Sequence, residues 1–71
     1  MTLAEKIYQA RKKAGLSQEA LADALGVTRQ AVSKWETGKS VPDTENIRRM
    51  ALILAVSADY FLGDTAKIPA D

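Results

Sequence analysis

Apolar residues recur along this chain at the three- and four-residue spacing that is typical of one face of a helix. No segment alternates apolar and polar residues in the manner of a β-strand. The periodic stretches predict five helices, at residues 3–14, 18–25, 28–37, 44–55 and 58–62. The expected fold class is therefore all-α, as a compact five-helix bundle.

The ends of these stretches carry residues that favour helix termini. Each predicted helix begins with a residue whose side-chain oxygen can cap it: Thr2, Ser17, Thr28, Asp43 and Ser57. Glycine supplies the left-handed conformation that ends many helices, and it follows four of the five: Gly15, Gly26, Gly38 and Gly63. This agreement between periodicity, caps and stops is the main argument for five helices and no sheet.

The residues expected to face the core follow the same spacing. In the first two helices they are Leu3, Ile7, Ala10, Ala14, Leu21 and Leu25. Ala20 and Ala24, beside the leucines, are small enough to let a neighbouring helix approach closely. In the third and fourth helices the inward residues are Ala31, Val32, Trp35, Ile47, Met50, Ala51 and Leu54.

Length and composition limit the possible functions. The chain has 71 residues, which suits one domain at 1–63, with 64–71 as a tail or as the start of a linker to a further C-terminal domain. The absence of Cys and His excludes disulfides and argues against a zinc site. No apolar run approaches the roughly 20 residues of a membrane span, so we expect a cytoplasmic protein.

Neither an enzyme nor a strongly basic protein is indicated. The chain has no Gly-rich phosphate loop and no His or Cys to act in catalysis, so we expect no enzymatic activity, cofactor or metal. The formal net charge is only +1, and any affinity for nucleic acid must therefore come from a local patch.

Ser17 to Gly38 reads as two short helices joined by a tight turn at Gly26. With its flanking residues, this stretch resembles the Cro/C1-type (XRE, phage-repressor-like) helix-turn-helix family over about residues 3–63. The matching segments are LSQEALA at 16–22, GVTRQAVSKWETG at 26–38, Pro42, LAVS at 54–57 and YFL at 60–62. The resemblance implies a five-helix lambda-repressor-like fold and sequence-specific binding of double-stranded DNA. It also implies a homodimer on DNA and a role in transcriptional regulation.

Two positions depart from the family pattern: Ala55, at the end of the fourth helix, and Ala58, where the family often has a larger apolar residue. The family often has Gly where this chain has Ala55. A left-handed alanine costs about 1 kcal/mol relative to glycine, so either the helix ends in another geometry or the chain accepts this cost.

The outward face of helix 28–37 holds the candidate base-contacting residues. They are Arg29, Gln30, Ser33 and Lys34. The N-terminal end of such a helix enters the major groove, where arginine can bridge guanine O6 and N7 and glutamine can bridge adenine N6 and N7. A solvated polar face would explain the polarity, but not the lack of any acid from Thr28 to Trp35.

Four further residues are candidates for contacts with the DNA backbone. Gln18 begins the helix that crosses the backbone in this docking mode, so its amide and the helix N-terminus would face a phosphate. Thr28 is a cap first, and its methyl or hydroxyl could also reach DNA, while Lys39 and Ser40 follow the recognition helix. For Ser40, either the hydroxyl or the backbone N–H would serve.

The resemblance also implies one structural ion pair. In relatives an acid at the position of Glu36 pairs with a basic residue of the first helix, and Arg11 is the matching residue. We expect this pair to be partly buried and to keep the carboxylate away from phosphates. Trp35 is expected to belong to the core.

Leu52 and Ile53 fall off the apolar stripe of the fourth helix. They are either single exposed apolar residues, which are common, or part of a self-complementary dimer patch with Tyr60 and Phe61.

The sequence thus predicts a DNA-binding transcriptional regulator that acts on a near-palindromic operator. We expect it to be a repressor. The alternative is a protein-interaction module or antitoxin-type domain that uses the same fold.

Overall fold

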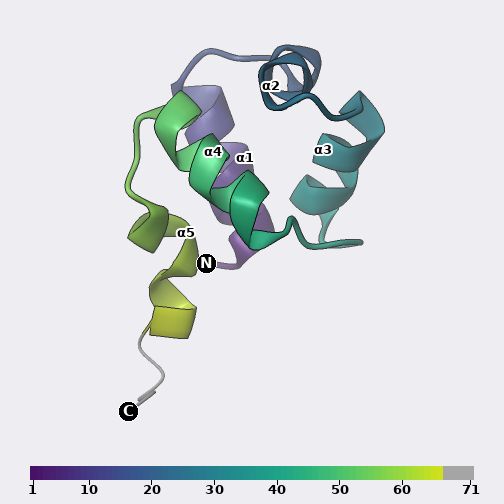
Figure 1. Cartoon of the computed structure of the whole chain (residues 1–71). Helices are drawn as coiled ribbons and strands as arrows, with labels where there is room; N and C mark the ends of the chain where they lie inside the picture. The colour runs from purple at the N-terminus through teal and green to yellow at the C-terminus, as the bar shows by residue number, and fades with distance from the viewer. Residues whose placement is uncertain (67–71) are drawn as a thin grey trace.

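The computed structural model describes residues 1–66, and every regular element in that range is an α-helix. The elements are α1 (Leu3–Lys13), α2 (Gln18–Leu25), α3 (Arg29–Thr37), α4 (Thr44–Leu54) and α5 (Ala58–Ala66) (Figure 1). The expected all-α class with five helices is confirmed for this part of the chain. At 8 to 11 residues each, none of these helices is long and apolar enough to cross a membrane.

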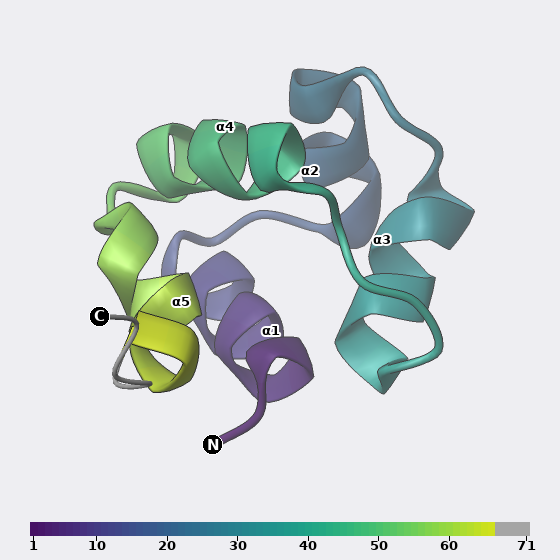
Figure 2. The same cartoon turned by 60° about the horizontal axis from the view of Figure 1, so that its bottom comes forward.

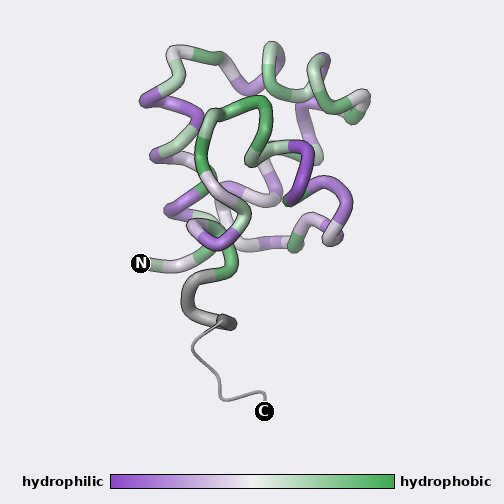
Figure 3. The backbone as a smooth tube through the Cα atoms, turned by 60° about the vertical axis from the view of Figure 1, so that its left-hand side comes forward, coloured by the Kyte–Doolittle hydropathy of each residue, from purple (hydrophilic) through white to green (hydrophobic). Residues whose placement is uncertain are grey.

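Contacts between neighbouring helices build the bundle. α1 packs against α3 and α5, while α4 packs against α2 and α5, and α2 and α3 contact each other closely. In Figures 1 and 2, α3 lies on the side of the molecule opposite to α5. Hydrophobic and hydrophilic segments alternate along the backbone in Figure 3, because each helix turns one apolar face inward. The third helix is therefore held at the edge of the bundle with its other face open.

The core contains residues from all five helices. Ile7, Leu21, Val32 and Met50 have no exposed surface, and Trp35 is 6% exposed. The inward residues predicted for α4 are all buried, and Ala31 in α3 is half-buried.

The small residue that allows close approach at α2 is not the one expected. Ala22 is 2% exposed and belongs to the core, whereas Ala24 is exposed and Ala20 only half-buried. The buried stripe of α2 consists of Leu21, Ala22 and Leu25. Ala24 lies outside this stripe and faces solvent. The expected inward Ala14 is exposed as well, because α1 ends at Lys13.

Hydrogen bonds fix the starts of α1 and α4 at the capping residues that the sequence predicts. Thr2 and Glu5 form a capping box: the Thr2 hydroxyl accepts from the Glu5 N–H at 3.1 Å, and the Thr2 N–H donates to the Glu5 carboxylate at 2.9 Å. The Asp43 carboxylate caps α4 by accepting from the Asn46 N–H at 2.8 Å. These caps set where α1 and α4 begin.

Helix α4 ends in a left-handed turn at Ala55. Ala55 ends α4 with φ 59° and ψ 42°, in the left-handed region, and it is the one non-glycine residue with positive φ among those described. The N–H of Val56 donates to the Ala51 carbonyl at 3.0 Å. The chain therefore accepts a strain of about 1 kcal/mol at this turn.

The expectation that Gly63 stops the fifth helix is wrong. The Ser57 hydroxyl caps α5 by accepting from the Tyr60 N–H at 3.2 Å, but the helix then runs through Gly63 to Ala66. A glycine inside a helix costs about 1 kcal/mol relative to alanine, which neighbouring turns can offset, so glycine alone does not end a helix. Of the expected tail, residues 64–66 are helical and 67–71 lie outside the described residues.

Phe61 does not belong to an exposed apolar patch. It is 3% exposed and packs in the core, with the Tyr60 ring edge-on at 5.3 Å between centroids. Leu52 is 76% exposed, and Ile53 and Tyr60 are half-buried. Because Phe61 points into the core, it anchors α5 on the bundle.

Candidate nucleic-acid interface

A short, well-bonded turn joins α2 to α3. Gly26 has φ 73°, a value that glycine adopts without the steric cost of a side chain. The Val27 N–H donates to the Ala22 carbonyl at 3.0 Å, and the half-buried Val27 side chain packs against the core. The Thr28 hydroxyl then caps α3 by accepting from the Ala31 N–H at 3.1 Å. Thr28 is thus engaged as a cap and lies at the exposed start of α3.

α3 divides cleanly into two faces. Val32 and Trp35 are buried in the core. The four expected base-contacting residues lie on the outer side, with Ser33 half-buried and the others exposed: Arg29, Gln30, Ser33 and Lys34. The structure therefore brings these side chains together on an outer face that carries no carboxylate.

Arg11 and Glu36 form the ion pair that the family resemblance implied. Arg11 Nε lies 2.5 Å from Glu36 Oε2, and Arg11 Nη2 donates to Glu36 Oε1 at 3.1 Å. The two side chains are 9% and 4% exposed. Arg11 Nη1 also donates to the Leu16 carbonyl at 2.8 Å. The pair joins α1 to the end of α3.

The Glu36 carboxylate changes the electrostatics of Arg11. The hydrogen bond to Glu36 and the charge of that carboxylate raise the pKa of the Arg11 guanidinium above its ordinary value, while burial opposes this shift. Arg11 also lies over the Tyr8 ring, with 5.4 Å between the guanidinium carbon and the ring centroid. The cation is therefore held on more than one side.

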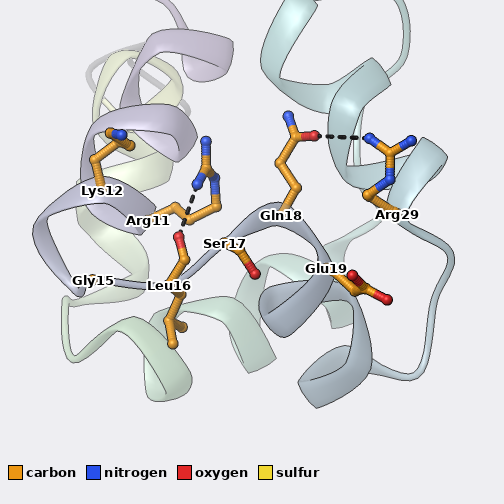
Figure 4. A pocket seen from close by; sticks show the side chains of 8 residues that line it. All are labelled: Arg11, Lys12, Gly15, Leu16, Ser17, Gln18, Glu19 and Arg29. Carbon is orange, nitrogen blue, oxygen red and sulfur yellow. Dashed lines mark hydrogen bonds between the residues drawn. The ribbon is translucent and has the colours of Figure 1, made fainter.

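Gln18 makes contacts that the sequence gave no reason to expect. Its Nε2 donates to Glu36 Oε1 at 3.0 Å. Its Oε1 accepts from Arg29 Nη1 at 3.5 Å (Figure 4). A chain of polar contacts thus runs from Arg11 through Glu36 and Gln18 to Arg29. One N–H of the Gln18 amide remains outside this chain, because Nε2 carries two hydrogens.

A hollow of about 540 Å³ lies beside this chain of contacts at the N-terminus of α2. The side chains around it come from α1, α2, α3 and the loop before α2 (Figure 4). The residues that line the hollow are Arg11, Lys12, Gly15, Leu16, Ser17, Gln18, Glu19 and Arg29. Of the three cationic residues, Arg11 is neutralised by Glu36, which leaves Lys12 and Arg29 against the anionic Glu19, and the first N–H groups of a helix have no partner inside it. The hollow therefore favours an anion.

The loop after α3 is tied to the helix through one carbonyl group. The Lys34 carbonyl accepts from the N–H groups of Lys39 at 2.9 Å and Ser40 at 3.3 Å, and from the Thr37 hydroxyl at 3.3 Å. The Ser40 N–H, which we expected to be one possible phosphate donor, thus has a partner within the chain. The side chains of Lys39 and Ser40 lie on exposed residues.

Arg49 links α4 to the end of α2. Its Nη1 donates to the Leu25 carbonyl at 3.1 Å, one of the last carbonyls of α2, which lack partners in their own helix. The neighbouring Arg48 pairs instead with Glu45 on the same helix at 2.6 Å. Spacing alone does not distinguish these two arginines, because only the packing of α4 on α2 brings Arg49 to Leu25.

Comparisons with known proteins agree with this geometry. A family model described as helix-turn-helix matches residues 7–61. The uncharacterized HTH-type transcriptional regulator YonR of the SPbeta prophage in Bacillus subtilis (strain 168) is 41% identical over 61 residues, which are 86% of this chain and 56% of YonR. The HTH-type transcriptional activator BcrR of Enterococcus faecalis is 40% identical over 62 residues, which are 87% of this chain and 30% of BcrR.

A solved structure shows the same fold. The crystal structure of the P22 c2 repressor protein in complex with synthetic operator 9T matches with a TM-score of 0.80 and 34% identity. The match covers 86% of this chain and 92% of that chain. Two helices joined by a glycine-containing turn, with the second helix exposed on its outer face, define a helix-turn-helix domain. The chain belongs to the Cro/C1-type helix-turn-helix family. It spans about half the length of YonR and less than a third of BcrR.

Proposed function

We propose that this domain binds double-stranded DNA in a sequence-specific manner and serves a cytoplasmic transcriptional regulator. The observation that carries the proposal is the outer face of α3, which has no carboxylate. A buried ion pair fixes α3 itself against α1. The P22 c2 repressor, whose fold this chain shares, is a protein whose structure was solved on operator DNA. We expect the regulator to repress transcription, although the relative BcrR is an activator.

The outer face of α3 enters the major groove in this proposal. Arg29 and Gln30, at the N-terminal end of the helix, contact base edges, and Ser33 and Lys34 contact bases about one turn further on. Each good bidentate contact is worth about 1–3 kcal/mol of discrimination against the wrong base.

The residues around this face bind the phosphate backbone. Gln18 offers the remaining N–H of its amide to a phosphate, and the hollow beside it leaves room for that phosphate at the N-terminus of α2. Thr28 contributes its side chain at the start of α3, and Lys39 and Ser40 contribute theirs from the loop after it. The net charge of +1 leaves little binding outside these contacts, so we expect a shallow dependence on salt.

A homodimer completes the proposal. Two copies place their α3 helices about 34 Å apart, in successive major grooves of a near-palindromic operator. Because this chain spans only part of its relatives, a further C-terminal domain or a protein partner belongs to the proposal too. The domain is assigned no catalytic role.

An NMR titration with duplex DNA of random sequence at low salt tests DNA binding. We expect shift changes at Gln18, residues 29–34 and Lys39. Selection of bound sequences from a random pool should then return two half-sites about 10–10.5 base pairs apart, or a multiple of that spacing. An absence of shift changes at these residues would contradict the proposal and favour a protein-interaction or antitoxin-type module.

A further inference from the structure

Two hollows adjoin on the side of the molecule where α1 meets α5 and the turn after α4. α1 and α5 lie side by side there (Figure 2). The hollows have volumes of about 600 and 350 Å³, and Ala10, Lys13 and Val56 line both of them. Because they share these residues, they form one depression, which we call the α1–α5 groove. None of the described residues that line the groove belongs to α2 or α3, so it is separate from the outer face of α3.

The floor of the α1–α5 groove is apolar. Ala10 is buried, while Ile53, Val56 and Tyr60 are half-buried and pack against the core. These side chains are fixed by the packing of the bundle, yet part of their apolar surface stays open to water. Covering that surface with other apolar side chains is favourable.

Two lysines supply the charge at the edge of the groove. Lys12 and Lys13 are exposed residues in the last turn of α1, and both line the larger hollow. None of the described residues that line the groove is acidic. Among the described residues, neither lysine has a carboxylate within ion-pair distance. An occupant that combines negative charge with apolar side chains therefore complements the groove.

The charge of the groove disfavours a second copy of this chain as the occupant. In a two-fold contact the same patch of both copies meets, so the lysines at the two edges would face each other and repel. One helical segment of another protein fits better. Its apolar side chains at positions i and i+3 or i+4 lie on one face and can enter the two adjoining hollows, while flanking carboxylates reach the lysines.

We propose that the α1–α5 groove binds an acidic amphipathic helix of a partner protein. The apolar side chains of that helix fill the two hollows, and its carboxylates pair with Lys12 and Lys13. The proposal goes beyond the proposed function, because it assigns to the domain a protein-binding surface that does not depend on contacts with DNA.

The probe that tests this proposal is a synthetic helical peptide with leucines along one face and glutamates on the others. Titrated into the isotope-labelled domain, it should shift the NMR signals of Lys13, Ala14 and Val56 and leave the signal of Gln30 on α3 unchanged. Two control peptides keep only one of the two features: one has lysine in place of glutamate, and the other has serine in place of leucine. Both should bind more weakly by about tenfold or more. An absence of shifts at the groove residues at about 1 mM probe peptide would overturn the proposal.

Two variants of the groove sharpen the test. Lys13→Gln removes the charge and keeps most of the side-chain length, and it should lower the affinity for the probe peptide about two- to fivefold, as expected for one exposed ion pair. Ala14→Glu places a carboxylate beside the smaller hollow and should also weaken binding. Ala14 is exposed, so this variant should stay folded, which thermal unfolding followed by circular dichroism checks. Arg48→Gln is the matched control, because Arg48 is an exposed cation of α4 that does not line the groove.

Equal effects of Lys13→Gln and Arg48→Gln on peptide binding would overturn the proposal, because binding would then reflect only a general attraction between opposite charges. A change in self-association of the Lys13→Gln domain without peptide, measured by analytical ultracentrifugation, would identify a second copy as the occupant and would also overturn it. A domain that binds duplex DNA but not the peptide contradicts this proposal alone. A domain that binds the peptide but no DNA contradicts only the proposed function.

Discussion

Arg11 and Glu36 lie 25 positions apart in the sequence, yet two hydrogen bonds join their side chains across α1 and α3. Both side chains are nearly inaccessible to solvent, at 9% and 4% exposed. The pair fixes the angle of α3 on the bundle and supplies the anchor for Gln18. Its loss should therefore affect folding first and DNA binding through folding.

Arg11→Met should lower the free energy of unfolding by about 3–5 kcal/mol, because it leaves the Glu36 carboxylate buried without its charged partner. Urea denaturation followed by circular dichroism measures this change. Arg48→Met is the matched control: the Arg48–Glu45 pair is 62% and 58% exposed, and its loss should cost about 0.5 kcal/mol or less. Equal effects of the two substitutions would show that the buried pair has no special role.

The same ion pair should make stability insensitive to pH in the neutral and mildly alkaline range. Glu36 raises the pKa of Arg11 in the folded state, so the folded state binds this proton more tightly than the unfolded state. The resulting stabilisation is fully present below the ordinary arginine pKa and is lost only as pH rises above it. Urea titrations of wild type and of a variant that lacks both charges, Arg11→Met with Glu36→Gln, should give a constant difference at several pH values through this range.

Ala55→Gly should stabilise the domain by about 1 kcal/mol, because glycine adopts the left-handed conformation of this residue without steric cost. For a domain of this size, the melting temperature should rise by about 4–8 °C. Ala14→Gly is a suitable control, since Ala14 ends α1 with φ −78° in the right-handed region and gains nothing from glycine. A destabilised Ala55→Gly protein would show that this turn carries no strain.

Gln30→Ala should change the base preference at one position of each half-site, at a cost of about 1–3 kcal/mol for the preferred base. The Gln30 side chain is exposed on α3, so its removal should leave the melting temperature close to that of wild type. Binding to a panel of operators with single changes measures the effect. A uniform loss of affinity across the panel would contradict a role in base recognition.

Lys39→Ala should weaken binding to every duplex by a similar factor, because Lys39 is placed to neutralise a phosphate. The slope of log affinity against log salt should fall in magnitude by about 1. Lys13→Ala, on the exposed last turn of α1, offers a comparison with a lysine outside the proposed interface. A salt slope that Lys39→Ala leaves unchanged would remove Lys39 from the interface.

Local patterns predicted most of the fold, because they depend on spacing and short-range hydrogen bonds. The helix starts at Thr2 and Asp43 and the stop at Gly26 are of this kind. The end of α5 escaped prediction, since a glycine stops a helix only where no further turn is stabilised. The buried Ala22 was missed for a related reason: a rotation of α2 by less than one residue decides which alanine faces inward.

The candidate site was predictable in its exposed face but not in its internal contacts. The outer residues of α3 follow from helical spacing, and the pairing of Arg11 with Glu36 followed from the family resemblance. The contact between Gln18 and Glu36 had no sequence signal, because it depends on how closely α2 approaches the end of α3. Side-chain amides in particular can serve as donor or acceptor, and only the tertiary structure decides between them.

The carbonyl of Lys34, which accepts from Lys39, Ser40 and the Thr37 hydroxyl, has a mechanical consequence. The loop cannot shift against α3 without breaking the bonds from the Lys39 and Ser40 N–H groups, so the backbones of the helix and of the start of the loop move together. In the proposed complex, the distance between the backbone of α3 and the backbone of Lys39 is then fixed. A duplex whose groove does not match this length must deform to make both contacts, and DNA resists such deformation to an extent that depends on its sequence. The domain would thereby respond to the width of the groove as well as to its bases.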